Sequence, residues 1–260
     1  MRDVCDLEVE RGRSLRGLLF DLDDTFLNEG HLEPGAFFAL GAMRDAGLRL
    51  VVVTGRPIGW ARILARQWPV DGVVSENGAI AAYLDEGKLH VLDPLPSQQR
   101  SQRREHLDAL IQKMHRRFAG LRAAEDAPLR VSDYTFDIGE YEHPPTSLVE
   151  EAVGFARAAG ARTTCSSVHL HVTYDGDDKA SGALRFLKRR FGEDPSAALS
   201  CYAFIGDSSN DASCFSAFDV TIGVSNLSGR FSLPPRFSTR AARASGFAEA
   251  AGTLIGLRQR

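Results

Sequence analysis

Short apolar runs that do not alternate with polar residues constrain the fold of this chain most strongly. The runs cover residues 18–20, 48–53, 70–74, 203–205 and 220–224. Continuous runs of this length are typical of strands buried on both faces of a parallel sheet. Helical patterns at 34–46 and 57–68 lie between them, each with a Pro near its first position. This order of strand and helix predicts a doubly wound parallel α/β sheet.

The middle of the chain has a different pattern. Residues 97–118 place apolar side chains at helical spacing, and a second helix is expected over 146–159. The segments 130–138 and 168–174 alternate, as half-exposed strands do. Helices on one face of a small antiparallel sheet form an α+β unit. We therefore expect residues 93–174 to form a second domain inserted into the first.

Two carboxylates, Asp21 and Asp23, directly follow the first apolar run. Because side chains alternate along a strand, residues two apart share a side. Two like charges held this close cost free energy unless a cation or a shared proton compensates them. The pair therefore predicts a Mg²⁺ site beside a nucleophilic aspartate.

Three further clusters of polar residues follow or precede other elements of the predicted sheet. They are Thr54-Gly55-Arg56 after the second run, Lys179 at the head of a helix expected over 180–190, and Asp207, Asn210 and Asp211 after the run 203–205. In an open α/β sheet, sites lie beyond the carboxyl ends of the strands, where the strand order switches. We expect these side chains to meet there, with hydroxyl, amide and ammonium groups suited to phosphoryl oxygens.

Each cluster has a simpler interpretation when it is taken alone. Asp23 and Asp24 are favoured turn or helix-capping residues. Thr54 could belong to an ordinary strand-to-helix turn, and Lys179 could be solvated. The joint occurrence of four clusters in this order favours a functional site over four independent accidents.

In order and spacing, the clusters resemble the four motifs of the haloacid dehalogenase superfamily. The chain is most similar to subgroup IIB, which includes sucrose-phosphate, trehalose-phosphate and mannosyl-phosphoglycerate phosphatases. The segment 74–79, with Asn77, resembles the "ENGA" stretch of that subgroup. The resemblance implies a Rossmann-like catalytic core of residues 1–92 and 175–260. It also implies that residues 93–174 form an α+β cap that selects the substrate.

The resemblance further implies a role for each motif residue. Asp21 would attack phosphorus and carry the phosphoryl group, and Asp23 would act as general acid and base. The implied Mg²⁺ ligands are Asp21, the backbone carbonyl of Asp23, and Asp207. Thr54, Gly55, Lys179 and Asn210 would bind the phosphate. Asp211 would not bind the metal directly but would orient waters or Lys179.

Candidates for substrate selection lie mainly in the expected cap. They are Arg56, Asn77, Arg130, Tyr134, His169 and His171. Their hydrogen-bonding groups favour a sugar or polyol phosphate, while Arg130 could instead bind a second anion, as in a phosphoglycerate conjugate. His169 and His171 share one face of an expected strand, but we predict no zinc site. Ordinary surface positions remain an equal alternative for this set.

Composition excludes several other classes. The formal net charge of −3 and pI near 6.2 make nucleic acid a poor default partner. No secretory signal and no apolar run approaching the ~20 residues of a membrane span are found. We therefore expect a cytoplasmic protein without a membrane partner. Four dispersed cysteines are expected to be buried free thiols, and the basic residues of 97–118 are expected to face solvent.

The sequence thus predicts a Mg²⁺-dependent phosphomonoester hydrolase with a small phosphate ester as its substrate. A phosphosugar mutase would use the same aspartyl-phosphate chemistry. A receiver-like phosphorylation module also clusters Asp, Thr and Lys near Mg²⁺, but it needs neither a cap nor a leaving-group acid. An inactive sugar-phosphate-binding protein is the last alternative. The sequence does not predict the oligomeric state.

Overall fold

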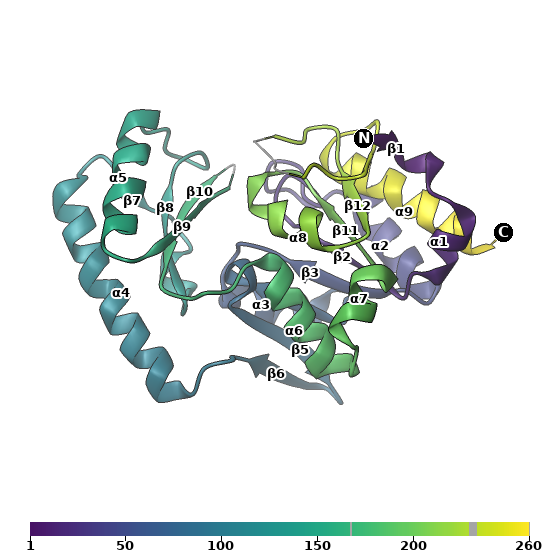
Figure 1. Cartoon of the computed structure of the whole chain (residues 1–260), viewed down its shortest axis with the longest axis horizontal. Helices are drawn as coiled ribbons and strands as arrows, with labels where there is room; N and C mark the ends of the chain where they lie inside the picture. The colour runs from purple at the N-terminus through teal and green to yellow at the C-terminus, as the bar shows by residue number, and fades with distance from the viewer. Residues whose placement is uncertain (167, 229–232, 260) are drawn as a thin grey trace.

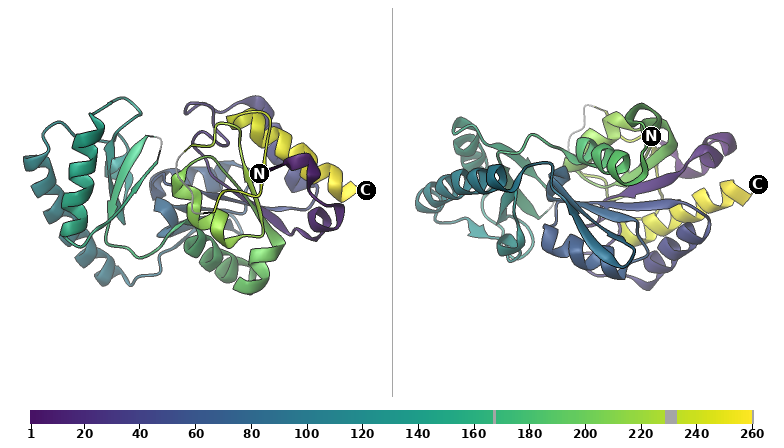
Figure 2. Two further views of the ribbon diagram at one scale, coloured as in Figure 1. Left: turned by 45° about the horizontal axis from the view of Figure 1, so that its top comes forward. Right: turned by 90° about the horizontal axis from the view of Figure 1, so that it is seen from below.

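The computed structural model describes residues 1–166, 168–228 and 233–259. Within them, a nine-stranded sheet and a four-stranded sheet lie in separate parts of the molecule (Figure 1). The smaller sheet and its two helices lie at the end away from both chain termini, and the turned views in Figure 2 agree. The chain therefore forms two units, and we call the smaller one, with α4 and α5, the cap.

The larger sheet is parallel through seven of its strands. In spatial order they are β1 (Arg2–Asp3), β13 (Phe237–Ser238), β12 (Val220–Gly223), β11 (Tyr202–Gly206), β2 (Gly17–Phe20), β3 (Arg49–Val53) and β4 (Gly72–Ser75). Two antiparallel strands, β5 (Ile80–Asp85) and β6 (Lys88–Leu92), extend the edge beside β4. From β2 the chain winds outward to β6, and it returns to pair β11 with β2. The strand order therefore switches between β2 and β11.

Helices cover both faces of this sheet. One face carries α1 (Val9–Ser14), α2 (Pro34–Asp45), α3 (Ile58–Gln67) and α9 (Arg243–Gln259), and the other carries α6 (Lys179–Phe191), α7 (Pro195–Cys201) and α8 (Ala212–Ala217). Alternate residues of one strand enter different cores: Leu18 and Phe20 pack on the first side, Leu19 on the second. The continuous apolar runs are explained by this burial on both faces, and the predicted doubly wound sheet is confirmed.

The cap sheet is antiparallel, with helices packed on one face. Its order is β7 (Arg122–Ala123), β8 (Asp133–Asp137), β10 (His169–Thr173) and β9 (Arg162–Cys165), and its helices are α4 (Ser97–Arg117) and α5 (Thr146–Ala158). Phe136, Leu170 and Val172 point to the helices and form the cap core with them. The α+β character of the insertion is confirmed, whereas its domain limits of 93 and 174 stay a prediction.

One predicted strand begins later than expected. Residues 130–132 do not join β8, which starts at Asp133. Their backbone amides are used differently: Val131, Ser132 and Asp133 donate to the Glu76 carboxylate, which lies in η2 (Glu76–Gly78) of the larger unit. The other short 3₁₀ helices are η1 (Val4–Asp6), η3 (Ala127–Leu129) and η4 (Ser209–Asp211). The alternating pattern could not reveal that a distant carboxylate competes for these amides.

Not every basic residue of α4 faces solvent, contrary to the sequence-based expectation. Arg100 is 9% exposed and forms ion pairs with Asp93, 2.8 Å, and Asp175, 2.5 Å. Arg103 also contacts Asp175, at 2.6 Å. Asp93 lies on the connection from β6 to α4, and Asp175 on the connection from β10 to α6. Arg100 therefore ties together the two connections between the cap and the larger unit.

The expectation of buried thiols is only partly right. All four cysteines are free, but Cys214 alone among them is buried, and Cys5 is exposed.

Among the described residues, no helix combines the length and the apolar character needed to cross a membrane.

The start of α6 packs very closely on η2. A Cβ atom on Gly182 would overlap the backbone of Gly78, and one on Gly78 would overlap the Asp178 carbonyl. Gly78 also has a φ of +104°, a conformation that other residues rarely adopt. Glycine at both positions lets the first turn of α6, with Lys179, approach the carboxyl end of β4.

We expect Gly182→Ala to lower the free energy of unfolding by about 1–3 kcal/mol, because the added methyl group forces the two backbones apart. Urea denaturation followed by circular dichroism would measure the change. The matched control is Gly252→Ala in α9, where a Cβ meets nothing within 4 Å. It should stabilise the protein by about 0.5–1 kcal/mol. Equal stability of the two variants would contradict the close-packing argument.

Candidate active site

The predicted motif residues meet at the carboxyl edge of the larger sheet, where the strand order switches. Asp21 directly follows β2, Thr54 follows β3 and Asp207 follows β11, and these three strands are neighbours. Lys179 is the first residue of α6, which is capped by Asp178. Four segments distant in sequence are therefore brought together by the winding of one sheet.

Lys179 is the centre of this cluster. Its ammonium is completely buried and lies 2.6 Å from Asp21 Oδ1 and 2.6 Å from Asp211 Oδ1. Burial alone would lower the pKa of Lys179, but the two carboxylates outweigh burial and raise it. Lys179 therefore stays charged, and it fixes the position of one Asp21 oxygen.

The remaining carboxylates of the cluster are not balanced by Lys179 alone. Burial raises the pKa of Asp21 against the effect of Lys179, and burial together with repulsion from Asp21 and Asp211 raises the pKa of Asp207. Asp21, Asp207 and Asp211 each contribute one carboxylate oxygen to a group of atoms that lie within 4.8 Å of one another. A divalent cation among them would reverse both shifts, so this group could hold a metal ion.

The hydrogen bonds distinguish the three carboxylates as ligands. Asp211 has partners on both oxygens, since Oδ1 accepts from Lys179 and Oδ2 from the amides of Asp207 and Ser208. Asp21 accepts from Lys179 on Oδ1, and Asp207 accepts from Thr25 Oγ1 on Oδ1, at 3.1 Å. The second oxygens of Asp21 and Asp207 are thus the better donors to a hard, oxygen-seeking cation such as Mg²⁺, with Asp211 supporting the cluster.

Thr54 and Gly55 form a tight turn above the end of β3. Thr54 is buried, and its hydroxyl oxygen accepts from the Arg56 amide at 3.0 Å. A Cβ on Gly55 would lie 3.1 Å from His171 Cε1 and 3.3 Å from Asn77 Oδ1. Asn77 Oδ1 is buried and has no hydrogen-bond partner among the described residues. The glycine therefore leaves space between an imidazole and an amide that face the turn.

Arg56 holds Asp23, the predicted acid and base, in this conformation. Its Nε lies 3.0 Å from Asp23 Oδ2 and its Nη2 2.9 Å from Asp23 Oδ1. The same Nη2 donates to Glu140 of the cap at 2.9 Å, and the guanidinium lies 4.7 Å from the Trp60 ring centroid. Burial opposes the charge, but the carboxylates raise the Arg56 pKa. Arg56 thereby joins the predicted general acid to the cap.

Two imidazoles of β10 point toward the crevice, and each is held by a carboxylate. His171 Nδ1 lies 2.8 Å from Asp133 Oδ2, and His169 Nε2 lies 2.9 Å from Glu140 Oε2. Burial lowers the pKa of His171, whereas the His169 bond, together with Arg56, lowers the pKa of Glu140 to about 2. The predicted shared face of the two histidines thus lies opposite the cap core.

Two candidates for substrate selection do not line the crevice. The Arg130 side chain is fully buried and bonds to Asp126, Asp133 and the Gly55 carbonyl. Its charge is already matched, so it is not placed to take a second anion. Tyr134 points to the helix side of the cap sheet, where its hydroxyl lies 2.8 Å from His115 Nε2. Both positions were inferred from residue type, which reveals neither that Arg130 precedes β8 nor which face of β8 Tyr134 occupies.

Glu76 is the main residue that the sequence interpretation missed. Its carboxylate is buried and accepts from the Ile58 amide of the larger unit. From the cap it accepts from the Ser132 amide at 2.6 Å and the Ser132 hydroxyl at 2.5 Å. Burial raises its pKa. Glu76 therefore docks the cap onto the larger unit; it lies in the "ENGA"-like segment 74–79 but was assigned no role from the sequence.

The docked cap leaves little space beside Asp21. The cavity there has a volume of about 10 Å³, roughly that of one water molecule. It is lined by Asp21, Asp23, Gly55, Ser166, His169, His171, Ser208 and Asn210. Asn210 Oδ1 accepts from the Ser208 hydroxyl at 2.8 Å. The structure therefore shows a closed conformation, which must open before a phosphate ester enters.

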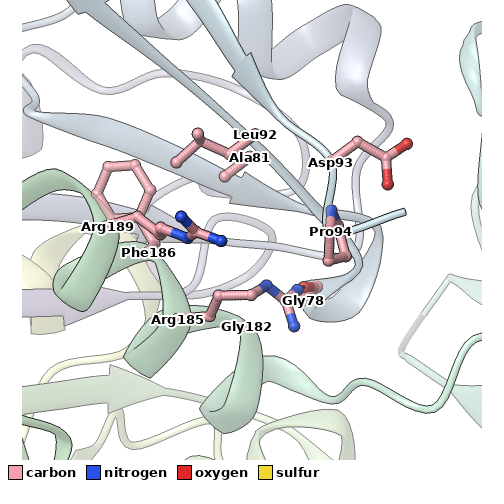
Figure 3. Close-up of a pocket in the computed structure, with 9 residues that line it drawn as sticks. All are labelled: Gly78, Ala81, Leu92, Asp93, Pro94, Gly182, Arg185, Phe186 and Arg189. Atoms are coloured by element: carbon pink, nitrogen blue, oxygen red, sulfur yellow. The ribbon is translucent and has the colours of Figure 1, made fainter. Parts of the chain in front are cut away.

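A separate cavity of about 320 Å³ lies on the far side of Gly78, between α6 and the β5–β6 hairpin. Figure 3 shows Arg185 beside Gly78 and Pro94, and Phe186 near Leu92. None of the predicted motif residues lines it. Because its lining is different, this cavity is distinct from the carboxylate cluster. Its Arg185 already donates to the Gly78 carbonyl and forms an ion pair with Asp177.

Comparisons with known proteins agree with this arrangement. A family model described as haloacid dehalogenase-like hydrolase matches residues 18–120. A phosphoglycolate phosphatase of Pyrobaculum neutrophilum is 29% identical over 248 residues, which cover 92% of this chain and 95% of that protein. The match extends over the cap as well as the larger unit.

Solved structures share the whole fold. A Thermoplasma acidophilum protein superposes with a TM-score of 0.75 at 17% identity, covering 94% of this chain and 99% of its own. The sucrose-phosphatase of Synechocystis, solved with sucrose and phosphate, has a TM-score of 0.64 at 17% identity, with 92% and 98% covered. The family model, the relative of nearly equal length and the shared fold show that this chain is similar to haloacid dehalogenase-like hydrolases and has the fold of phosphatases of this kind.

Proposed function

We propose that this hydrolase is a Mg²⁺-dependent phosphomonoesterase that acts through an aspartyl phosphate on a sugar phosphate or a related small metabolite. The observation that carries the proposal is the environment of Lys179. One fully buried ammonium contacts Asp21 and Asp211 beside Asp207, at the edge where Thr54 and Gly55 turn. This combination of excess carboxylates, one fixed cation and a turn that presents a hydroxyl and backbone amides suits phosphoryl transfer.

The carboxylate excess supports the choice of cofactor. Asp21, Asp207 and Asp211 share a single cation in Lys179. The proposed ligands are Asp21, the backbone carbonyl of Asp23, and Asp207. When bound, Mg²⁺ would stabilise these carboxylates in their ionised form and supply positive charge for the phosphoryl oxygens.

In the first step, an Asp21 oxygen attacks phosphorus, and the bond from phosphorus to the leaving oxygen breaks. Lys179 holds Asp21 Oδ1 at 2.6 Å and thereby fixes the orientation of the attacking carboxylate. The Thr54 hydroxyl, the Gly55 amide, Lys179 and Asn210 are proposed to stabilise the oxygens that carry the charge. The proton on the leaving oxygen comes from Asp23, which must part from Arg56 to donate it.

In the second step, Asp23 takes a proton from a water molecule, and the resulting hydroxide attacks the phosphorus of the aspartyl phosphate. The bond between phosphorus and Asp21 breaks, and inorganic phosphate leaves. Asp23 regains its proton in this step, so each turnover returns the enzyme to its starting state.

The cap supports a small, polar substrate. His169, His171 and Asn77 face the space above Gly55 and offer hydrogen bonds to a leaving group. The relative from Pyrobaculum neutrophilum is named for phosphoglycolate, and a structural neighbour is a sucrose-phosphatase. The net charge of −3 does not favour nucleic acid. We therefore propose a small phosphorylated metabolite as the substrate and the cytoplasm as the location.

We expect phosphate release from sugar phosphates to require Mg²⁺ and to stop with EDTA. Asp21→Asn should lower kcat at least about 10³-fold, because the amide is a poor nucleophile. The matched control is Asp24→Asn in the same loop, a position with φ of +54° that Asn tolerates. Asp24→Asn should stay within about tenfold of the wild type in an inorganic phosphate assay. Full activity of Asp21→Asn would refute the mechanism.

Product analysis distinguishes the mutase alternative. A hydrolase converts glucose 6-phosphate to glucose and inorganic phosphate, whereas a mutase returns an isomeric sugar phosphate. Ion chromatography of the same reactions would detect either product. Isomerisation without phosphate release would replace the proposed function.

We expect the thermal stabilisation by Mg²⁺ to grow with pH. The pKa values of Asp21 and Asp207 are raised without a cation. Their contribution to stability is therefore complete below the unfolded pKa and is lost as pH rises through the folded values. Mg²⁺ binds the ionised form, so the increase in Tm should be larger at about pH 8 than at about pH 5.

Thermal denaturation with Mg²⁺ or EDTA at both pH values tests this dependence without an activity assay. Asp207→Asn should remove most of the Mg²⁺ effect, while Asp24→Asn should retain it. A Mg²⁺ effect that is equal at both pH values, or unchanged in Asp207→Asn, would rule out the proposed ligand set.

A further inference from the structure

Three neighbouring cavities lie along the boundary between the cap and the larger unit, and the smallest is the one at Asp21. Asp23 lines both the small cavity and a middle cavity of about 360 Å³. Arg56 and Glu140 in turn line both the middle cavity and a third cavity of about 700 Å³. We call the third one the outer cavity. Because neighbouring cavities share lining residues, we infer that the leaving group of an ester bound at Asp21 lies on the side of the outer cavity.

The outer cavity has an acidic lining. Its carboxylates are Glu29, Glu125, Asp126 and Glu140. Arg56 is the one Arg or Lys among its lining residues in the described part of the chain. Arg56 is already engaged by Asp23 and Glu140 at 2.9 Å each, and it lies 3.5 Å from Asp126. Its positive charge is therefore matched before any ligand arrives.

The arginines near these cavities also form ion pairs. Arg243, which lines the middle cavity, lies 3.2 Å from Asp24 and 3.0 Å from Glu29. Arg130, directly behind Asp126, is fully buried between Asp126 and Asp133. A carboxylate on a leaving group would have to break one of these pairs. Breaking a partly buried pair leaves a charge without its partner, which costs free energy.

The other walls of the outer cavity suit a ring with hydroxyl groups. Trp60 and Tyr141 bring amphipathic aromatic rings, and Tyr141 is 71% exposed. Leu129, 49% exposed, adds an apolar surface. A volume of about 700 Å³ lies within the range of small-molecule sites. Carboxylates such as Glu125 accept hydrogen bonds from hydroxyl or ammonium groups.

We propose that the leaving group carries hydroxyl or amino groups and no carboxylate, as in a neutral sugar phosphate or an amino-sugar phosphate. This inference rests on the proposed phosphomonoesterase function and deepens it. It differs from the substrate named for the Pyrobaculum neutrophilum relative, phosphoglycolate, which carries a carboxylate. The opposite outcome has a clear route: a substrate carboxylate would take the place of Glu140 on Arg56.

Three six-carbon substrates of different charge test the inference. They are glucose 6-phosphate, glucosamine 6-phosphate and 6-phosphogluconate, compared by kcat/KM with saturating Mg²⁺. We expect glucosamine 6-phosphate and glucose 6-phosphate to exceed 6-phosphogluconate by about tenfold or more, from one uncompensated charge. p-Nitrophenyl phosphate reports the chemical step separately.

A matched pair of variants attributes the discrimination to the outer cavity. Glu125→Gln removes one lining carboxylate far from the reacting atoms and should narrow the ratio of glucosamine 6-phosphate to 6-phosphogluconate by about threefold or more. Glu150→Gln removes an exposed carboxylate of α5 that does not line the cavity, and it should leave the ratio unchanged. Glu150→Gln should also hydrolyse p-nitrophenyl phosphate as the wild type does.

The outcomes separate the two proposals. If p-nitrophenyl phosphate is hydrolysed with Mg²⁺ but 6-phosphogluconate equals or exceeds glucosamine 6-phosphate, the inference about charge is overturned and the proposed function stands. An unchanged ratio in Glu125→Gln also overturns it. If no ester is hydrolysed with Mg²⁺, the proposed function fails, and the inference fails with it.

Discussion

The buried ammonium of Lys179 is the interaction on which the site depends. A lysine without solvent needs compensating negative charge, and Asp21 and Asp211 supply it at 2.6 Å each. The fold makes this contact possible because Gly182 allows the start of α6 to lie directly on η2. The same contact uses one oxygen of Asp21 and leaves the other toward the crevice. Burial, charge pairing and the orientation of the proposed nucleophile are thus consequences of one close approach between helix and sheet.

The closed position of the cap depends on a second set of buried charges. Glu76 accepts hydrogen bonds from consecutive cap amides, and Arg56 connects Asp23 with Glu140. These contacts form only when cap and larger unit meet, whereas Arg100 joins the two connections independently of that meeting. Opening therefore separates Glu76 and Arg56 from their cap partners while the tie at the connections can persist. The freeing of Arg56 also changes the surroundings of Asp23, so cap position and the proposed acid are linked through one guanidinium.

Much of the core could be predicted from sequence because each motif residue stands next to a regular element. Asp21, Thr54 and Asp207 directly follow buried parallel strands, and the carboxyl ends of such strands meet in space. Lys179 begins a helix, so its position followed as well. Tyr134 was harder, since alternation identifies two faces without telling which one meets the site, and Arg130 precedes β8 and is held by buried partners that no sequence pattern reveals. The role of Glu76 and the start of β8 could not be predicted. Glu76 and Ser132 bond to each other across 56 residues of sequence, and this bond depends on how the cap docks.

The site divides its electrostatic work between the two units. Near Asp21, Lys179 and the proposed cation would attract the phosphate, which every substrate of a phosphomonoesterase carries. Toward the surface, Asp126 and Glu140 contact Arg56, and Glu125 lines the same outer cavity, which is proposed to meet only the leaving group. The attraction acts on the phosphate of the substrate, whereas the repulsion of carboxylates acts on its leaving group. Selection can therefore change through residues such as Glu125, at the edge of the cap, while Asp21 and Lys179 keep their geometry.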